Sequence, residues 1–217
     1  MNFEQARFNM VEQQIRPWEV LDARVLSLLQ TIPREDFVPV QYRKLAFADM
    51  AIPMEANQVM MRPKIEARML QALDVKADET VLEIGTGSGF ITACLADQAQ
   101  HVVSVEIVEE LHREAKARLD SRGVTNVEYF CDDAMGDWQP EQAHDVVVVT
   151  GSVPSVPETF LGWVNPGGRM FVVRGESPAM EACLMTRKGV SEWLVESLFE
   201  TDLPRLVNAT PEPEFEF

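Results

Sequence analysis

The first residues with an evident chemical use form a glycine-rich turn. Residues 81–89 read Val-Leu-Glu-Ile-Gly-Thr-Gly-Ser-Gly, an apolar stretch that runs into three glycines at alternate positions. Glycine tolerates positive φ and lets a ligand approach the backbone closely, so such a turn after a strand is typical of a nucleotide-like ligand site. The pattern alone leaves open a nicotinamide cofactor, a flavin, or a tight turn that binds nothing.

Acidic side chains follow the next two apolar segments, at the point where each segment ends. Glu106 lies 17 residues after Gly89, close to the spacing at which an acidic residue reaches ribose hydroxyls in dinucleotide folds. Asp132 and Asp133 follow the third segment, where a carboxylate could accept a hydrogen bond from an adenine amino group. The structural alternatives are a carboxylate that favours a helix N-terminus and a solvated acidic turn.

The glycine spacing distinguishes two classes of nucleotide ligand. NAD sites favour Gly-x-Gly-x-x-Gly, whereas this turn reads Gly-x-Gly-x-Gly with Glu83 just before it. S-adenosylmethionine carries a sulfonium, an ammonium and a carboxylate but no phosphate. A pocket ringed by Glu83, Glu106 and Asp133 suits its cationic character better than it suits a pyrophosphate. The residues therefore favour S-adenosylmethionine as the cofactor and methyl transfer as the reaction.

With these residues the sequence resembles the class I S-adenosylmethionine-dependent methyltransferases and, within them, the protein-L-isoaspartate O-methyltransferase family. The likeness extends over most of the chain and includes residues 34–39, 46–49, 81–90, 145–150 and 166–169. The resemblance implies that Gly85, Gly87 and Gly89 line the methionine portion of the cofactor, Glu106 the ribose and Asp133 the adenine. We expect the whole cofactor site to comprise Glu83, Gly85, Thr86, Gly87, Ser88, Gly89, Glu106, Ile107, Asp133 and Ala134.

The loop before Pro63 departs from that family. The family has glycine, glutamine, threonine, an apolar residue and serine there, where residues 57–61 read Asn-Gln-Val-Met-Met. Val59 and Met61 replace both hydroxyls, and the resemblance implies that the lost serine helps to place an isoaspartyl carboxylate. The candidate catalytic residues are Gln58, Met61 and Arg62. An arginine fork can hold a carboxylate through two hydrogen bonds, although Arg62 could equally be a solvated side chain.

Three functions remain open. The resemblance implies methylation of a carboxylate on damaged protein, with an isoaspartyl protein or peptide as the partner. A carboxylate is already ionised at neutral pH, so such an enzyme needs alignment and desolvation more than a proton acceptor. The first alternative is a small apolar acceptor held by Met54, Met60 and Met61, because methionine adapts to irregular apolar surfaces. The second is a module that binds the cofactor without catalysis.

Alternating strand and helix patterns are expected to position these residues. Apolar runs at 80–84, 102–107, 126–131, 145–150 and 169–174 are typical of strands, and helical patterns separate them at 90–99, 108–119 and 157–164. This order predicts an α/β fold, a Rossmann-like and mostly parallel sheet with helices on both faces. Residues 182–188 and 192–199 predict a C-terminal antiparallel hairpin at the sheet edge. The tail at 211–217 alternates glutamate and phenylalanine and could add an edge strand or fray.

The N-terminal part has a different pattern. Residues 4–30 carry apolar positions at helical spacing, interrupted at Pro17, and predict two helices or a kinked one. Prolines punctuate the irregular stretch from Pro33 to Pro63, which we expect to be functional, and a helix should start at Pro63. We therefore predict one domain, with an N-terminal helical cap and substrate loop over residues 1–62 and the methyltransferase part over residues 63–217.

Composition excludes several classes of partner. The 35 acidic and 19 basic side chains leave a formal net charge of -16, which repels a phosphate backbone, so we expect no nucleic-acid partner. No apolar run is long enough for a membrane span and no signal-peptide pattern begins the chain, which favours the cytoplasm and no membrane association. The three cysteines are far apart and give little support to disulfides or a metal site. Oligomeric state is not readable, and a monomer is the default expectation.

Overall fold

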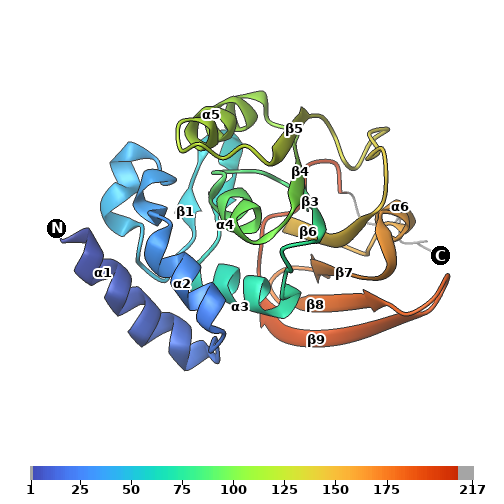
Figure 1. The fold of residues 1–217 in the computed structure, drawn as a ribbon, viewed down its shortest axis with the longest axis horizontal. Helices are drawn as coiled ribbons and strands as arrows, with labels where there is room; N and C mark the ends of the chain where they lie inside the picture. Colours follow the sequence, from blue (N-terminus) through green and yellow to red (C-terminus); the bar gives the residue numbers. More distant parts are fainter. Residues whose placement is uncertain (1, 210–217) are drawn as a thin grey trace, which may run out of the picture.

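A central seven-stranded sheet organises the computed structural model, which describes residues 2–209 (Figure 1). Its strands are β3 (Thr80–Ile84), β4 (His101–Glu106), β5 (Val127–Cys131), β6 (His144–Val153), β7 (Val164–Arg174), β8 (Met180–Arg187) and β9 (Trp193–Thr201). They lie in the order β5-β4-β3-β6-β7-β8-β9. The first five pair in parallel, whereas β8 and β9 are antiparallel to their neighbours. The predicted mostly parallel sheet and C-terminal antiparallel hairpin are confirmed.

The β-branched run in β6 explains why this strand lies at the centre of the sheet. Val146, Val147, Val148 and Val149 have no exposed surface. Because successive side chains of a strand point to opposite faces, Val146 and Val148 join one apolar cluster while Val147 and Val149 join the other. A strand buried on both faces needs cover on both, and this requirement fixes where the helices pack.

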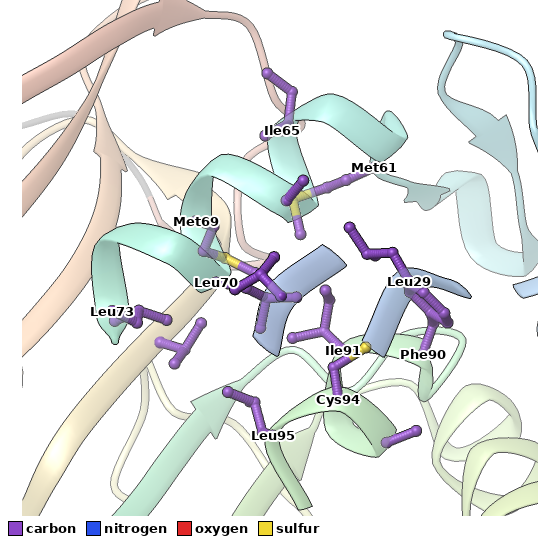
Figure 2. Close-up of a cluster of buried hydrophobic side chains, with 14 of the residues drawn as sticks. Leu29, Met61, Ile65, Met69, Leu70, Leu73, Phe90, Ile91, Cys94 and Leu95 are labelled. Carbon is purple, nitrogen blue, oxygen red and sulfur yellow. The ribbon is translucent and has the colours of Figure 1, made fainter. Parts of the chain in front are cut away.

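Helices cover the two faces unequally. The larger apolar cluster lies under α2 (Ala23–Thr31), α3 (Pro63–Leu73) and α4 (Phe90–Gln98), and α5 (Glu109–Asp120) packs beside them over β4 and β5. Figure 2 shows this cluster, with Met69 and Leu73 of α3 above Ile91 and Leu95 of α4. The opposite face is covered by the five-residue α6 (Glu158–Gly162), whose Phe160 stacks on Trp163. The prediction of helices on both faces is confirmed.

The N-terminal helices share the core of the sheet. α1 (Phe3–Met10) continues through a π-helical turn (Val11–Ile15) and a 3-10 turn (Arg16–Trp18) that contains Pro17, and the chain then turns into α2. The Asp22 side chain accepts hydrogen bonds from the backbone N–H groups of Arg24 and Val25 and so caps α2. Figure 1 shows α2 between α1 and α3, and α2 contacts both helices. The predicted interruption at Pro17 is therefore where the first helical segment ends.

The proline-punctuated stretch forms short ordered turns. Three 3-10 turns (Arg34–Asp36, Val40–Leu45 and Glu55–Asn57) alternate with a small hairpin of β1 (Ile52–Pro53) and β2 (Val59–Met60). Ala56 and Asn57 have positive φ, which closes the tight turn between the two strands. We call residues 54–62 the acceptor loop.

Some boundaries differ from those predicted. The predicted strand at 169–174 begins earlier, since β7 starts at Val164 and includes residues 165–168. Val164 already pairs with His144, across a register shift from the rest of the ladder. The helix predicted at 157–164 is correspondingly shorter. The alternating tail at 211–217 lies outside the described residues. Within residues 2–209, no helix combines the length and apolar character that crossing a membrane requires.

Candidate active site

A cleft lies where the carboxyl ends of β3, β4 and β5 meet the end of β6. The chain runs outward from β3 through β4 to β5 and then returns to β6 on the other side of β3, so the strand order reverses between β3 and β6. Open α/β sheets bind ligands at such a switch point. The cleft holds about 710 Å³ of empty space, its open mouth included. This volume lies in the range of small-molecule sites.

The glycine turn forms the floor of the cleft. Gly85 and Gly87 have φ values of 95° and 53°, and both line the cavity. A Cβ on Gly85 would fall on the Thr150 hydroxyl, which donates to the carbonyls of Ile84 and Gly85 at 2.9 and 2.5 Å. A Cβ on Gly87 would lie 3.3 Å from the terminal methyl of Met54. Both positions therefore require glycine if the cleft is to stay open.

Glu106 points into the cleft beside this turn. Its Oε2 accepts a hydrogen bond from the Gly87 N–H at 2.8 Å, and its Oε1 accepts one from the Val108 N–H at 2.9 Å. The side chain lines the cavity although the residue is only 6% exposed. A carboxylate offers about four acceptor positions, so each oxygen keeps one for a ligand hydroxyl. Two hydrogen bonds from the backbone thus fix the orientation of the carboxylate and leave acceptor positions free for a ligand.

The second acidic group of the cleft follows β5. Asp132, Asp133 and Ala134 line the cavity, as does Ile107 on the neighbouring strand end. Asp133 Oδ1 accepts from the Met135 N–H at 2.8 Å, and its Oδ2 accepts from the Asn208 side-chain amide at 2.7 Å. The structure therefore brings Asp133 and Ala134 together with Glu106 and Ile107, as the sequence predicted.

Glu83 lies beneath the turn and not in the cleft. It has no exposed surface, and its Oε2 accepts hydrogen bonds from the hydroxyls of Thr92 and Ser104, both at 2.6 Å. Burial raises the pKa of Glu83 to about 8. The residue alternates with Leu82 and Ile84, which point to the other face of the sheet, and Ile84 is the one that lines the cleft. The expected ring of three carboxylates is corrected: Glu106 and Asp133 line the cleft, whereas Glu83 does not.

The remaining turn residues also support the cleft from outside. Thr86 and Ser88 are buried and line a smaller adjoining cavity of about 310 Å³, and the Thr86 hydroxyl bonds that of Ser104 at 2.6 Å. Gly89 begins α4, and a Cβ there would lie 3.2 Å from Ala115 of α5. Gly89 therefore permits close helix packing and does not line the cleft.

The acceptor loop closes the opposite side of the cleft. Met54, Gln58, Val59 and Met61 all line it. Arg62, in contrast, is exposed at the start of α3 and is not part of the lining. Of the three predicted catalytic residues, the structure brings Gln58 and Met61 to the cofactor-side residues and leaves Arg62 outside.

Comparison with known proteins assigns the family. A family model described as protein-L-isoaspartate(D-aspartate) O-methyltransferase matches residues 5–200. The chain belongs to this family. Protein-L-isoaspartate O-methyltransferase 2 of Pelobacter propionicus is 36% identical over 209 residues, which cover 96% of this chain and 93% of the relative. The Rhodopseudomonas palustris protein-L-isoaspartate O-methyltransferase is also 36% identical, over 94% of this chain and 96% of its own.

The solved structures agree on the fold. A candidate protein-L-isoaspartate O-methyltransferase from Plasmodium falciparum, in complex with S-adenosyl-L-homocysteine, superimposes with a TM-score of 0.78 at 16% identity. It covers 95% of this chain and 98% of its own. The predicted family and the predicted enzyme class, an S-adenosylmethionine-dependent O-methyltransferase, are confirmed.

Sequence reasoning missed one wall of this methyltransferase cleft. Residues 203–207 line it, after the chain has left β9 and returned to β6. Buried Ser152 holds this segment: its N–H donates to the Pro204 carbonyl and its carbonyl accepts from the Leu206 N–H, both at 2.9 Å. A Cβ on Gly151 would lie 2.8 Å from Leu206. Gly151 directly follows the β-branched run of β6, and a glycine there is the sequence signal that another segment of backbone packs closely against this strand.

The charged groups of the cleft are mostly acidic. Glu106, Asp132 and Asp133 line it, and the single arginine in the lining, Arg205, forms an ion pair with Glu176. Within the described part of the chain, no histidine lines the cleft. Cys131 is exposed at the end of β5, next to Asp132. An acidic cleft suits a cationic ligand.

Proposed function

We propose that this methyltransferase transfers the methyl group of S-adenosylmethionine to the free carboxylate of an isoaspartyl residue in a protein or peptide. The observation that carries the proposal is the shared cavity. Glu106, fixed by the Gly87 N–H, and the acceptor-loop residues Gln58 and Met61 line the same cleft. Curated relatives that are 36% identical over nearly the whole chain carry the corresponding name.

The residues of the cleft fit this cofactor. Glu106 keeps free acceptor positions for the two ribose hydroxyls, and Asp133 offers a carboxylate for the adenine amino group. Gly85 and Gly87 leave room for the methionine portion, because side chains there would meet Thr150 and Met54. S-adenosylmethionine supplies an electrophilic methyl group on a sulfonium. We assign Glu83, Thr86, Ser88 and Gly89 a supporting role, since they hold the turn from below.

The chain's own residues have to align and desolvate the acceptor. An isoaspartyl carboxylate is ionised at neutral pH, so no residue has to remove a proton before it attacks the methyl group. The apolar side chains of Met54, Val59, Met61 and Leu206 exclude water from the cleft, and loss of hydration makes a carboxylate more reactive. Among the acceptor-loop side chains that line the cleft, the Gln58 amide is the one that can donate a hydrogen bond to it. In this proposal residues 1–62 supply the acceptor side and residues from 63 onward the cofactor side.

A second candidate function is methylation of a small apolar acceptor. Gln58 apart, the acceptor-loop side chains that line the cleft are apolar, and neither position 59 nor position 61 offers a hydroxyl. Methionine side chains adapt to irregular apolar ligands. In this second candidate function the cofactor is the same and the methyl acceptor is a small apolar molecule.

Two measurements test these assignments. Calorimetry with S-adenosylmethionine tests the cofactor site, and transfer of a radiolabelled methyl group to an isoaspartyl peptide tests the acceptor, with the normal aspartyl peptide of the same sequence as control. Labelling of the isoaspartyl peptide alone supports the proposed function. Cofactor binding with labelling of small molecules from an extract, but not of the peptide, supports the second candidate. Binding with no transfer to any acceptor indicates a non-catalytic module, and no binding contradicts the cofactor site.

A further inference from the structure

A buried ion pair lies behind the acceptor loop. Arg34 has no exposed surface and Glu66 is 1% exposed, and Arg34 Nη1 contacts Glu66 Oε2. Arg34 belongs to the first 3-10 turn of the proline-punctuated stretch, whereas Glu66 lies in the first turn of α3. Glu66 also lines the smaller cavity that adjoins the cleft. The pair therefore joins the N-terminal cap to the wall of the active site.

Arg34 uses the rest of its guanidinium to join two more segments. Its Nε donates to the Ala46 carbonyl at 2.8 Å, and its Nη2 donates to the Met61 carbonyl at 2.7 Å. The guanidinium carbon lies 5.0 Å from the centre of the Phe90 ring. Phe90 directly follows the last glycine of the turn. One side chain thus contacts both the acceptor loop and the start of the helix that follows the cofactor turn.

We propose that Arg34 is a positioning residue, which through the Met61 carbonyl fixes the acceptor loop relative to the glycine turn and so sets the affinity for the methyl acceptor. The inference rests on the proposed function for the nature of that acceptor. Arg34 itself does not line the cleft, so its effect has to pass through the loop.

The backbone pairing of the loop explains why an outside support is needed. β1 and β2 pair at two positions, Ile52 with Met60 and Pro53 with Val59. The ladder therefore ends one residue before Met61, whose side chain lines both the cleft and the smaller cavity. Met61 is the first residue beyond the ladder, and its carbonyl accepts a hydrogen bond from Arg34 where a strand partner would otherwise donate one.

Stability alone does not account for an ion pair in this place. Removing two charges from water is costly, and an apolar pair of similar volume often folds as well or better. A planar guanidinium, in contrast, presents several donors in a fixed geometry, which an apolar side chain cannot do. Glu66 supplies the negative charge that offsets the cost of burying an arginine. Arg34 supplies hydrogen-bond donors at fixed angles, which reach the carbonyls of Ala46 and Met61.

The chain contains a matched control. Arg7 Nη2 pairs with Glu35 Oε1 at 2.5 Å, and the two side chains are 14% and 7% exposed. Arg7 also donates to the Gln30 carbonyl at 3.2 Å. This second arginine–glutamate pair holds α1 to the 3-10 turn that also carries Arg34, and the bond to Gln30 holds α1 to the last turn of α2; neither Arg7 nor Glu35 contacts the acceptor loop or lines the cleft. Its loss should affect the fold without displacing the acceptor loop.

The test compares Arg34→Lys with Arg7→Lys. Lysine keeps the charge but cannot reach Glu66, Ala46 and Met61 together, so Arg34→Lys should raise the acceptor-peptide KM about tenfold and leave the cofactor Kd within about twofold. Arg7→Lys should leave both within about twofold of wild type. Equal changes in the two variants, or a cofactor Kd that rises as much as the peptide KM in Arg34→Lys, would overturn the inference.

A second readout keeps the inference separate from the choice of acceptor. Amide hydrogen exchange over residues 57–62 should accelerate about tenfold in Arg34→Lys and stay unchanged in Arg7→Lys. Equal exchange in the two variants overturns the inference whatever the acceptor is. If wild type fails to methylate the isoaspartyl peptide, the proposed function fails, while the exchange result still decides the role of Arg34.

Two further variants guard against simple misfolding. Glu66→Gln keeps an oxygen for Arg34 Nη1 but removes the counter-charge, so it should lower the free energy of unfolding while the folded variant retains a peptide KM within about threefold of wild type. The double variant Arg34→Met with Glu66→Leu fills the buried space without charges and should fold, yet it should show the raised KM and the faster loop exchange. Wild-type exchange over the loop in this double variant would also refute a positioning role.

Discussion

Replacing Glu83 with glutamine should protect the protein against unfolding at alkaline pH. Glu83 has no exposed surface, and no ion pair includes it within the described chain. Its Oε2 accepts from two hydroxyls, while its Oε1 has no partner. Burial raises the pKa of this carboxyl to about 8, and the negative charge of Glu106 acts in the same direction. Glutamine has nearly the same shape, still accepts from both hydroxyls and never ionises.

The sign and size of the effect follow from linkage. A folded-state pKa of about 8 against an ordinary 4.5 means that Glu83 favours folding fully below pH 4.5. As the pH rises toward 8, the unfolded chain has released its proton and the folded chain still holds it, so this contribution is lost. The complete loss is about 5 kcal/mol, most of which, about 3 to 4 kcal/mol, falls between about pH 5 and pH 8.

Urea unfolding of the cofactor-free protein measures this loss directly. The free energy of unfolding of Glu83→Gln minus that of wild type should rise by about 3 to 4 kcal/mol between about pH 5 and pH 8. Glu196→Gln, which changes an exposed glutamate on β9, is the control and should give a flat difference. A Glu83→Gln difference that changes by less than about 1 kcal/mol over this range would refute the reasoning.

Three further predictions concern the cleft. Glu106→Ala removes the proposed ribose acceptor and the partner of the Gly87 N–H, so calorimetry should show cofactor binding weakened about a hundredfold; an unchanged Kd would exclude Glu106 from the site. Gly85→Ala places a Cβ on the Thr150 hydroxyl at a residue with positive φ, so thermal unfolding should show that the free energy of unfolding falls by about 2 to 4 kcal/mol. A melting temperature equal to that of wild type would contradict the turn geometry. Val59→Thr combined with Met61→Ser restores two hydroxyls to residues that line the cleft and should raise kcat/KM for an isoaspartyl peptide about tenfold. No gain would count against the role of these two positions.

Features that depend on neighbours in the sequence could be predicted from it. β3 occupies residues 80–84 as predicted, because a β-branched apolar run that ends in glycines signals a strand and its turn locally. The same local signals located Glu106 and Asp133 at adjacent strand ends, since parallel strands end at one edge of a sheet. For the same reason Gly85 and Gly87 could be recognised as positions with positive φ.

Features that depend on contacts between distant segments could not be predicted in this way. The return of residues 203–207 to Ser152 joins the end of the described chain to β6 and leaves no periodic pattern. The placement of Glu83 could have been predicted. Side chains alternate along a strand, so Glu83 and Ile84 point to opposite faces, and Ile84 is the one that lines the cleft. This alternation is a stronger guide than the expectation that a carboxylate next to a ligand-binding turn faces the ligand. Arg62 lies outside the lining of the cleft because its direction depends on how α3 starts, and the sequence of the loop does not specify this.

The cleft has two chemically different halves, and their difference bears on how an anion can react there. Glu106, Asp132 and Asp133 make the cofactor half acidic, whereas Met54, Val59 and Met61 make the acceptor half apolar. An anionic acceptor entering the cleft alone would meet like charges in a poorly hydrated space, which is unfavourable. The ammonium of S-adenosylmethionine is balanced by its own carboxylate, and its sulfonium adds a positive charge that offsets part of the acidic charge of the cleft next to the reacting methyl group. On the proposed function, the cofactor therefore contributes to acceptor binding as well as to the chemistry, and an apolar acceptor wall without a cation of its own is sufficient.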